Sequence, residues 1–118
     1  MPRIAVLQMT SGIDPEANFA VIEQAANDAK ADGAEMLFTP EMSLLLDRDR
    51  KRAEPHIVSQ DDSPFLARFV EVAAKLELWF TVGTPVRLPT GKFANRQWLF
   101  GPDGGIPRYY DKIHMFDV

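Results

Sequence analysis

The end of the chain, residues 109–118, places charged side chains among large apolar ones in the order Tyr-Tyr-Asp-Lys-Ile-His-Met-Phe-Asp-Val. Lys112 and His114 are its cationic and titratable members, with a carboxylate on either side at Asp111 and Asp117. Partial burial among apolar groups shifts the pKa of such side chains, and shifted groups cluster where proteins do chemistry. The plainer alternative is a charged strand end that runs into a loop.

A second stretch, residues 36–42, reads Met-Leu-Phe-Thr-Pro-Glu-Met and delivers a single acid, Glu41, directly after a proline. A carboxylate can move a proton, and an ammonium such as that of Lys112 can stabilise an oxyanion. The two groups also suit each other, because a glutamate facing an ammonium keeps its charge despite burial. We therefore expect Glu41 and Lys112 to meet at one rim of the fold. The alternative for Glu41 is a solvated loop acid.

Two short apolar runs in the first part of the chain predict parallel strands. Residues 4–9 predict a buried strand, and residues 36–39 predict a second one that follows an intervening helix. Glu41 then lies just past the carboxyl end of a parallel strand, the edge at which α/β sheets gather ligands. The long connection at residues 43–62 is expected to border the mouth of the pocket.

Two helices are predicted from their starts and their apolar stripes. Asp14 and Pro15 give a helix start, the helix spans residues 15–31, and Gly33 supplies the stop. Ser63-Pro64 opens the second helix in the same manner. Apolar residues at spacings of three and four predict that both helices pack on the same face of a sheet; in the second helix they are Phe65, Phe69, Val72 and Leu76.

The last part of the chain changes from helices to hairpins. Residues 78–82 predict a third buried strand, closed by Gly83 and Pro85. Residues 95–100 and 106–111 predict two further strands that lie side by side, since turn sequences precede and separate them. The sheet is therefore expected to change from parallel to mixed.

Composition narrows the class of protein. The 118 residues suit a single domain, and 46% hydrophobic with 25% charged residues is typical of a globular chain. A formal charge of −4 argues against a nucleic-acid partner. With no cysteine and only His56 and His114 as histidines, no metal or other cofactor is expected. No membrane span and no signal peptide are expected, which predicts a cytoplasmic protein.

The Pro-Glu step at Glu41 and the segment Tyr-x-Lys-x-His-x-Phe around Lys112 resemble the nitrilase superfamily of carbon-nitrogen hydrolases, in its amidase-like branch. The resemblance covers residues 3–118, which correspond to only the N-terminal part of such a hydrolase domain. It implies an α/β fold, the nitrilase-like α-β-β-α sandwich, of which residues 1–118 supply the first sheet and its outer helices.

The same resemblance assigns roles. Glu41 would move protons, Lys112 would hold the tetrahedral intermediate, and a cysteine nucleophile would follow beyond Val118. Such an enzyme would hydrolyse a small amide or carbamoyl compound and need no cofactor. Other residues of the matched segments would line or support the substrate pocket: Asn95, Tyr110, His114 and Phe116. For His114 the alternative is a hydrogen-bonded structural histidine.

Two other functions compete with the hydrolase. A truncated or pseudoenzyme chain would fold and self-associate without catalysis, which the absence of cysteine favours. A nucleotide-binding domain is the weaker alternative, because the turn after the first strand has no glycine-rich phosphate loop. If only one sheet of the sandwich is present, its inner face is an apolar patch, so we expect self-association, most simply as a dimer.

Overall fold

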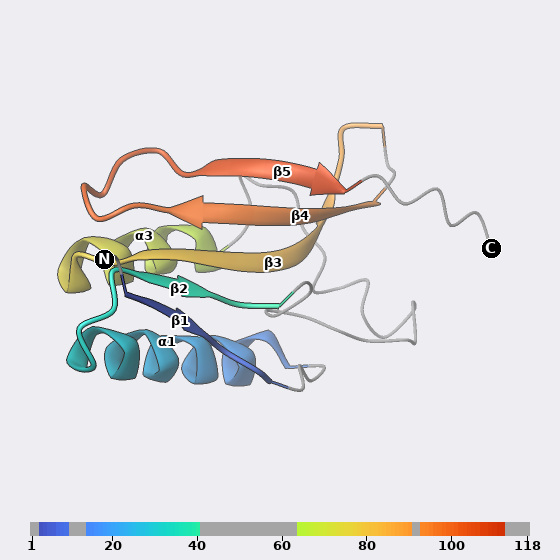
Figure 1. Cartoon of the computed structure of the whole chain (residues 1–118). Helices are drawn as coiled ribbons and strands as arrows, with labels where there is room; N and C mark the ends of the chain where they lie inside the picture. Colours follow the sequence, from blue (N-terminus) through green and yellow to red (C-terminus); the bar gives the residue numbers. More distant parts are fainter. Residues whose placement is uncertain (1–2, 10–13, 41–63, 91–92, 113–118) are drawn as a thin grey trace.

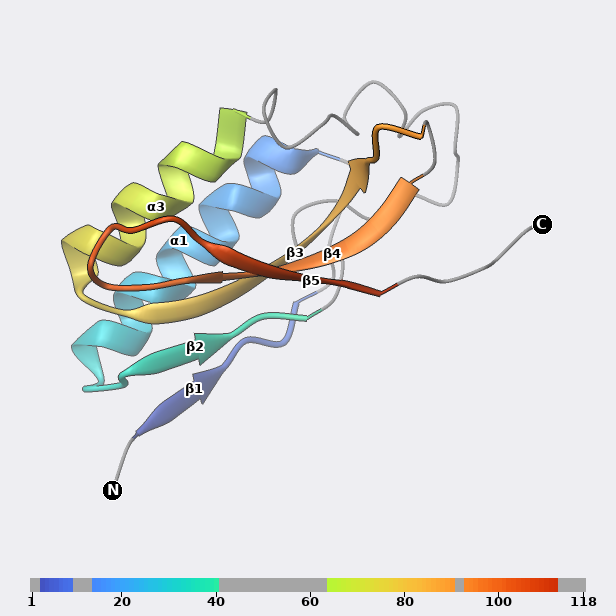
Figure 2. The ribbon, with the colours of Figure 1, turned by 90° about the horizontal axis from the view of Figure 1, so that it is seen from above.

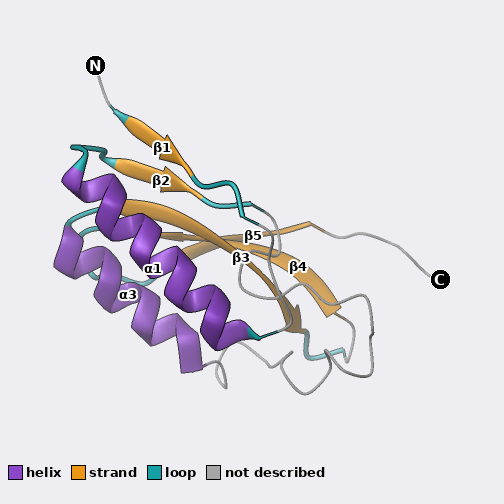
Figure 3. Cartoon of the chain, turned by 90° about the horizontal axis from the view of Figure 1, so that it is seen from below, coloured by secondary structure: helices purple, strands orange, loops and turns teal. Residues whose placement is uncertain are grey.

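The computed structural model describes residues 3–9, 14–40, 64–90 and 93–112. These residues form one five-stranded sheet in the order β1-β2-β3-β4-β5, with two helices against it (Figure 1). Figures 2 and 3 place both helices on the same side of the sheet, as the sequence predicted. The elements are β1 (Ile4–Val6), α1 (Pro15–Ala31), β2 (Met36–Phe38), α3 (Pro64–Leu76), β3 (Trp79–Arg87), β4 (Phe93–Phe100) and β5 (Arg108–Lys112).

The ends of α1 follow from local chemistry. Asp14 is the N-cap: its Oδ1 accepts a hydrogen bond of 3.0 Å from the backbone N–H of Glu16, and Pro15 needs no donor partner in the first turn. At the other end Gly33 takes a φ of +82°, a left-handed conformation that suits glycine. The predicted span of residues 15–31 is confirmed.

The sheet changes from parallel to antiparallel at β3, as predicted. β1, β2 and β3 pair in parallel, whereas β3, β4 and β5 pair antiparallel. The prediction that Gly83 and Pro85 close the third strand was wrong, because β3 continues to Arg87. Pairing with β2 ends at Phe80, and from there the ladder with β4 alone carries β3 through both residues. A proline is tolerated where one side of a strand needs no donor.

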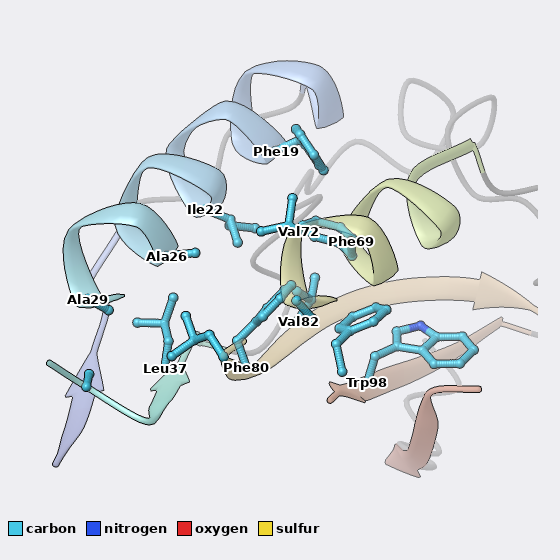
Figure 4. Packing of buried hydrophobic residues seen from close by; sticks show 14 residues of the cluster. Phe19, Ile22, Ala26, Ala29, Leu37, Phe69, Val72, Phe80, Val82 and Trp98 are labelled. Carbon is cyan, nitrogen blue, oxygen red and sulfur yellow. The ribbon is translucent and has the colours of Figure 1, made fainter. Parts of the chain in front are cut away.

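The core lies between the two helices and the sheet (Figure 4). Its centre is a set of aromatic rings, in which Phe69 of α3 lies 4.7 Å from Phe19 of α1 and 5.4 Å from Phe100 of β4, between ring centroids. Phe80 of β3 stacks on Phe100 at 5.1 Å. Truncating such a ring to alanine costs about 3–5 kcal/mol. Figure 4 shows Phe19, Phe69 and Phe80 meeting from α1, α3 and β3.

The first strand is exposed, so the prediction that it is buried was wrong. It has only three residues, and Ile4 and Val6 are 58% and 68% exposed. β1 is an edge strand, and these two side chains point away from the helices, on a face that nothing in the described ranges covers. Further exposed apolar side chains lie on the same sheet face, from β2, β3 and β5: Phe38, Trp79 and Tyr110. We call this surface the uncovered face.

One buried ion pair joins β4 to β5. The Arg96 guanidinium donates to both carboxylate oxygens of Asp111, at 2.6 and 2.9 Å, with the two side chains only 7% and 22% exposed. The Arg96 guanidinium carbon also lies 3.8 Å from the centroid of the Tyr109 ring. The hydrogen bond to Asp111 raises the pKa of Arg96, against the opposing effect of burial. This pair fixes the register of β5 at the residue before Lys112.

Breaking this pair from one side should destabilise the fold. Arg96→Met leaves the Asp111 carboxylate without its two donors in a partly buried place, so we expect a loss of about 2–3 kcal/mol in the free energy of unfolding, measured with urea. The double variant Arg96→Met/Asp111→Leu should lose less, because no unpaired charge remains. Arg108→Met, an exposed arginine of β5, is the control and should be nearly neutral. Equal losses in Arg96→Met and Arg108→Met would contradict the assignment.

The helices are also tied by an exposed ion pair with a pH dependence. Arg68 of α3 donates to both carboxylate oxygens of Glu16 at 2.8 Å, and this hydrogen bonding lowers the pKa of Glu16. A carboxylate with a lowered pKa contributes stability above its unfolded-state pKa, near 4.5, and loses it as the pH falls.

Glu16→Gln should therefore lower the midpoint of thermal unfolding slightly at pH 7, and the difference from the parent protein should shrink below about pH 4. Glu35→Gln, which removes an exposed carboxylate elsewhere, is the control. A difference that stays constant from pH 7 to pH 3 would show that the charge of Glu16 is not involved.

Candidate functional site

The carboxyl end of β2 is the place where the sequence predicted a catalytic acid. Thr39 and Pro40 directly follow this strand, and the Leu7 N–H donates to the Phe38 carbonyl at 2.8 Å, which keeps the ends of β1 and β2 together. A hollow of about 360 Å³ opens here, lined by Val6, Leu7, Gln8, Met9, Phe38, Thr39 and Pro40. Glu41 itself lies outside the described residues, so the structure places the chain only as far as Pro40, the residue before the acid.

Three groups of Thr39 form hydrogen bonds: its backbone N–H, its hydroxyl and its carbonyl. Its N–H donates to Thr81 Oγ1 at 3.0 Å, and its Oγ1 donates to the Thr81 carbonyl at 2.6 Å. Its carbonyl oxygen accepts from Gln97 Nε2 at 3.4 Å. The residue two positions before Glu41 is therefore fixed against β3 and β4, although β2 has already ended.

Gln97 is a site residue that sequence reasoning missed. It belongs to β4, pairs with Gly83 of β3 and Tyr110 of β5, and reaches past β3 to the end of β2. Its Oε1 is buried and accepts no hydrogen bond from the part of the chain that the structure describes. The local sequence carries no signal for it, because Gln97 ends a run of three polar residues in the segment Asn-Arg-Gln-Trp-Leu-Phe.

The second predicted cluster lies at the end of β5. The backbone of Lys112, the last described residue, pairs with Asn95 of β4, and Tyr110 pairs with Gln97. Asn95 is half-buried, whereas Tyr110 is 71% exposed on the uncovered face. His114 and Phe116 lie outside the described residues.

Strand direction brings the ends of β2 and β5 to one edge of the sheet. β4 runs antiparallel to β3 and β5 antiparallel to β4, so β5 runs in the same direction as β3 and β2. The carboxyl ends of β2 and β5 therefore lie at the same edge, as the arrowheads in Figure 1 show. Glu41 follows the first of these ends by three residues, and Lys112 is the last residue of the second.

A second hollow, of about 330 Å³, lies on the uncovered face and includes the first residues of β2 and β5, Met36 and Arg108. Its walls come from β2, β3, β4 and β5, and its lining includes Met36, Thr81, Gln97, Leu99, Arg108 and Tyr110. The hollow contains Gln97 and Thr81 but not the last residues of β2 or β5. An apolar hollow with a few polar groups is the usual form of a small-molecule site.

The described ranges contain neither a candidate metal site nor a candidate membrane-spanning helix. No group of three or more His, Cys, Asp or Glu side chains that could hold a metal ion is found there. Among the same residues, no helix combines the length and the apolar character that crossing a bilayer requires.

Known proteins give the family. A family model described as carbon-nitrogen hydrolase matches residues 3–118. The deaminated glutathione amidase of Yersinia enterocolitica is 34% identical over 121 residues, which cover 98% of this chain and 41% of that protein. The chloroplastic omega-amidase of Arabidopsis thaliana is 26% identical, with 98% and 32% covered.

Solved structures give the fold. The amidase from Nesterenkonia AN1, of the nitrilase superfamily, matches with a TM-score of 0.81 at 21% identity, covering 99% of this chain and 45% of that one. The NitFhit protein of C. elegans matches with a TM-score of 0.80 at 26% identity, covering 100% and 30%. The chain spans less than half the length of each of these relatives. It belongs to the carbon-nitrogen hydrolase family, and it supplies one sheet and its helical layer of the nitrilase fold.

Proposed function

We propose that residues 1–118 are the N-terminal part of the single catalytic domain of an amidase that hydrolyses a small carboxamide or carbamoyl compound. Glu41 moves the protons, Lys112 stabilises the oxyanion, and the nucleophile is a cysteine that lies beyond Val118 in the parent protein. The observation that carries this proposal is the common sheet edge at which β2 and β5 end, because it leads both residues toward one place.

The chemistry needs each of these groups. Glu41 takes the proton of the cysteine thiol, whose sulfur attacks the amide carbon, and the carbonyl oxygen becomes an oxyanion beside the Lys112 ammonium. When the tetrahedral intermediate collapses, the C–N bond breaks and the leaving nitrogen takes the proton from Glu41. Water then attacks the thioester, gives a proton to Glu41, and releases the acid and the thiol.

The relatives support the substrate class. One is named for deaminated glutathione and another for ω-amides. A solved structure of a mutant of the Nesterenkonia amidase shows acrylamide added to its active-site cysteine. Asn95, Tyr110, His114 and Phe116 would support or line the pocket in this proposal, with no cofactor. A cytoplasmic location, expected from the sequence, is part of the same proposal.

A second candidate function is self-association without catalysis. The uncovered face favours it, because exposed apolar side chains from four strands lie together there: Ile4, Val6, Phe38, Trp79 and Tyr110. The absence of cysteine from the 118 residues points the same way for this chain taken alone.

The catalytic proposal is tested in the protein that contains these residues together with the downstream cysteine. Glu41→Gln and Lys112→Ala should each lower kcat for ammonia release from a small amide by about 100-fold or more, because each removes a group needed in the transition state. Lys75→Ala, an exposed lysine of α3, is the control and should leave turnover unchanged. Full turnover in either site variant would defeat the proposal.

The association proposal is tested on residues 1–118 alone. Sedimentation should find dimers or larger species, and a dye that binds exposed apolar surface should fluoresce. Val6→Thr, on the uncovered face, should weaken association, whereas Val21→Thr, at an exposed valine of α1, should not. A monodisperse monomer that binds no dye would rule out self-association.

A further inference from the structure

The carbonyl group of Thr39 receives a hydrogen bond from a strand that is not its neighbour. β3 lies between β2 and β4 in the sheet, yet Gln97 of β4 donates to the Thr39 carbonyl at 3.4 Å. The residue paired with Gln97 on β3 is Gly83, which has no side chain, so the glutamine side chain can lie across that strand. The contact therefore depends on residues from three segments of the chain.

This contact contributes little to stability. The donor–acceptor distance of 3.4 Å is long for an amide hydrogen bond. The same side chain also buries Oε1 without a donor from the described residues, and a buried unsatisfied acceptor is unfavourable. An apolar side chain of similar length would avoid that penalty. A glutamine at this position is therefore better explained by what its Nε2 holds than by the stability of the sheet.

Gln97 Nε2 binds the carbonyl of Thr39, which precedes the proposed general base, Glu41, by two residues. Thr39 is fixed by Thr81 through its N–H and its Oγ1, which sets one end of the residue. Gln97 fixes the carbonyl at the other end, from which the chain continues through Pro40 to Glu41. The proline restricts the backbone further, since its ring fixes φ near −65°.

We propose that Gln97, together with Thr81, is a positioning residue for the general base. It sets the direction in which the chain leaves β2, and in the proposed amidase that direction leads Glu41 toward Lys112. This inference rests on the proposed amidase function. Neither Gln97 nor Thr81 touches the reacting atoms in it.

The test compares two identical substitutions in the protein that carries the downstream cysteine. Gln97→Met removes the hydrogen bond to Thr39, and Gln24→Met removes an amide of α1 that donates to Asp28 Oδ1 at 3.0 Å on the surface. Gln97→Met should unfold at the same urea concentration as the parent or a higher one, yet lower kcat about tenfold with little change in KM, because small misplacements of a catalytic group are costly. Gln24→Met should leave kcat and KM unchanged.

The pH profile separates positioning from folding. A Glu41 held less closely to the Lys112 ammonium has a higher pKa, so the acid limb of kcat/KM should move to higher pH in Gln97→Met and stay in place in Gln24→Met. If Gln97→Met fails to fold, substitutions of Thr81 provide the test. Thr81→Val should show the same loss of kcat and the same shift of the acid limb, and Thr81→Ser should keep the parent values.

The possible failures can be told apart. If Glu41→Gln abolishes turnover but Gln97→Met keeps the parent kcat and pH profile, the positioning role is overturned and the amidase proposal stands. If Glu41→Gln leaves turnover intact, the amidase proposal falls and the positioning role falls with it. A Gln97→Met protein that loses stability in proportion to its loss of activity would overturn the positioning role as well.

Discussion

The structure depends on one constraint: within the described ranges, both helices cover the same face of the sheet and leave the other uncovered. The stripes of α1 and α3 bury a row of side chains from β2, β3 and β4, including Leu37, Phe80 and Phe100. Successive residues of a strand point to opposite faces, so burying this row fixes where every other strand residue points. A shift of one residue would expose the aromatic core and bury the polar network around Thr39. The packing of two helices thus determines the geometry at the edge of the sheet.

The directions of the strands determine which strand ends lie at the same edge of the sheet. The change from parallel to antiparallel pairing at β3 makes the chain return along β4 and leave again along β5. That third passage ends at the edge where β2 ended earlier, more than seventy residues before Lys112. Two ties hold this edge from opposite faces of the sheet: the Arg96–Asp111 ion pair on the helical side and the Thr39–Thr81–Gln97 network on the other. Both lie within two residues of a proposed catalytic group.

The uncovered face has a physical meaning in this arrangement. Ile4, Val6 and Tyr110 are exposed in positions where a sheet of a sandwich is packed against its mate. The family relatives are more than twice as long as this chain, and their nitrilase fold is matched by less than half of each. The uncovered face is therefore the kind of surface that a sandwich buries against a second sheet.

The sequence alone determined the features that depend on neighbours along the chain. The cap at Asp14, the stop at Gly33 and the apolar spacing of residues 64–76 predicted both helices and their common face. The turns after β3 and β4 predicted a mixed sheet, and the Pro-Glu and Lys-x-His segments predicted the family. The positions of Glu41, His114 and Phe116 stay predictions, because these residues lie outside the described ranges.

Only the tertiary structure decided the features that depend on partners distant in sequence. The same apolar pattern predicts a buried strand at residues 4–9 and at 36–39, but the layer that would bury the first is not among the described residues, so Ile4 and Val6 are exposed. Gly83 and Pro85 predict the end of a strand, but pairing with β4 continues the strand through both residues. Gln97 and Arg96 show no local sign of a role, because each acts through a residue that the fold alone brings near: Thr39, 58 residues away, and Asp111, 15 residues away.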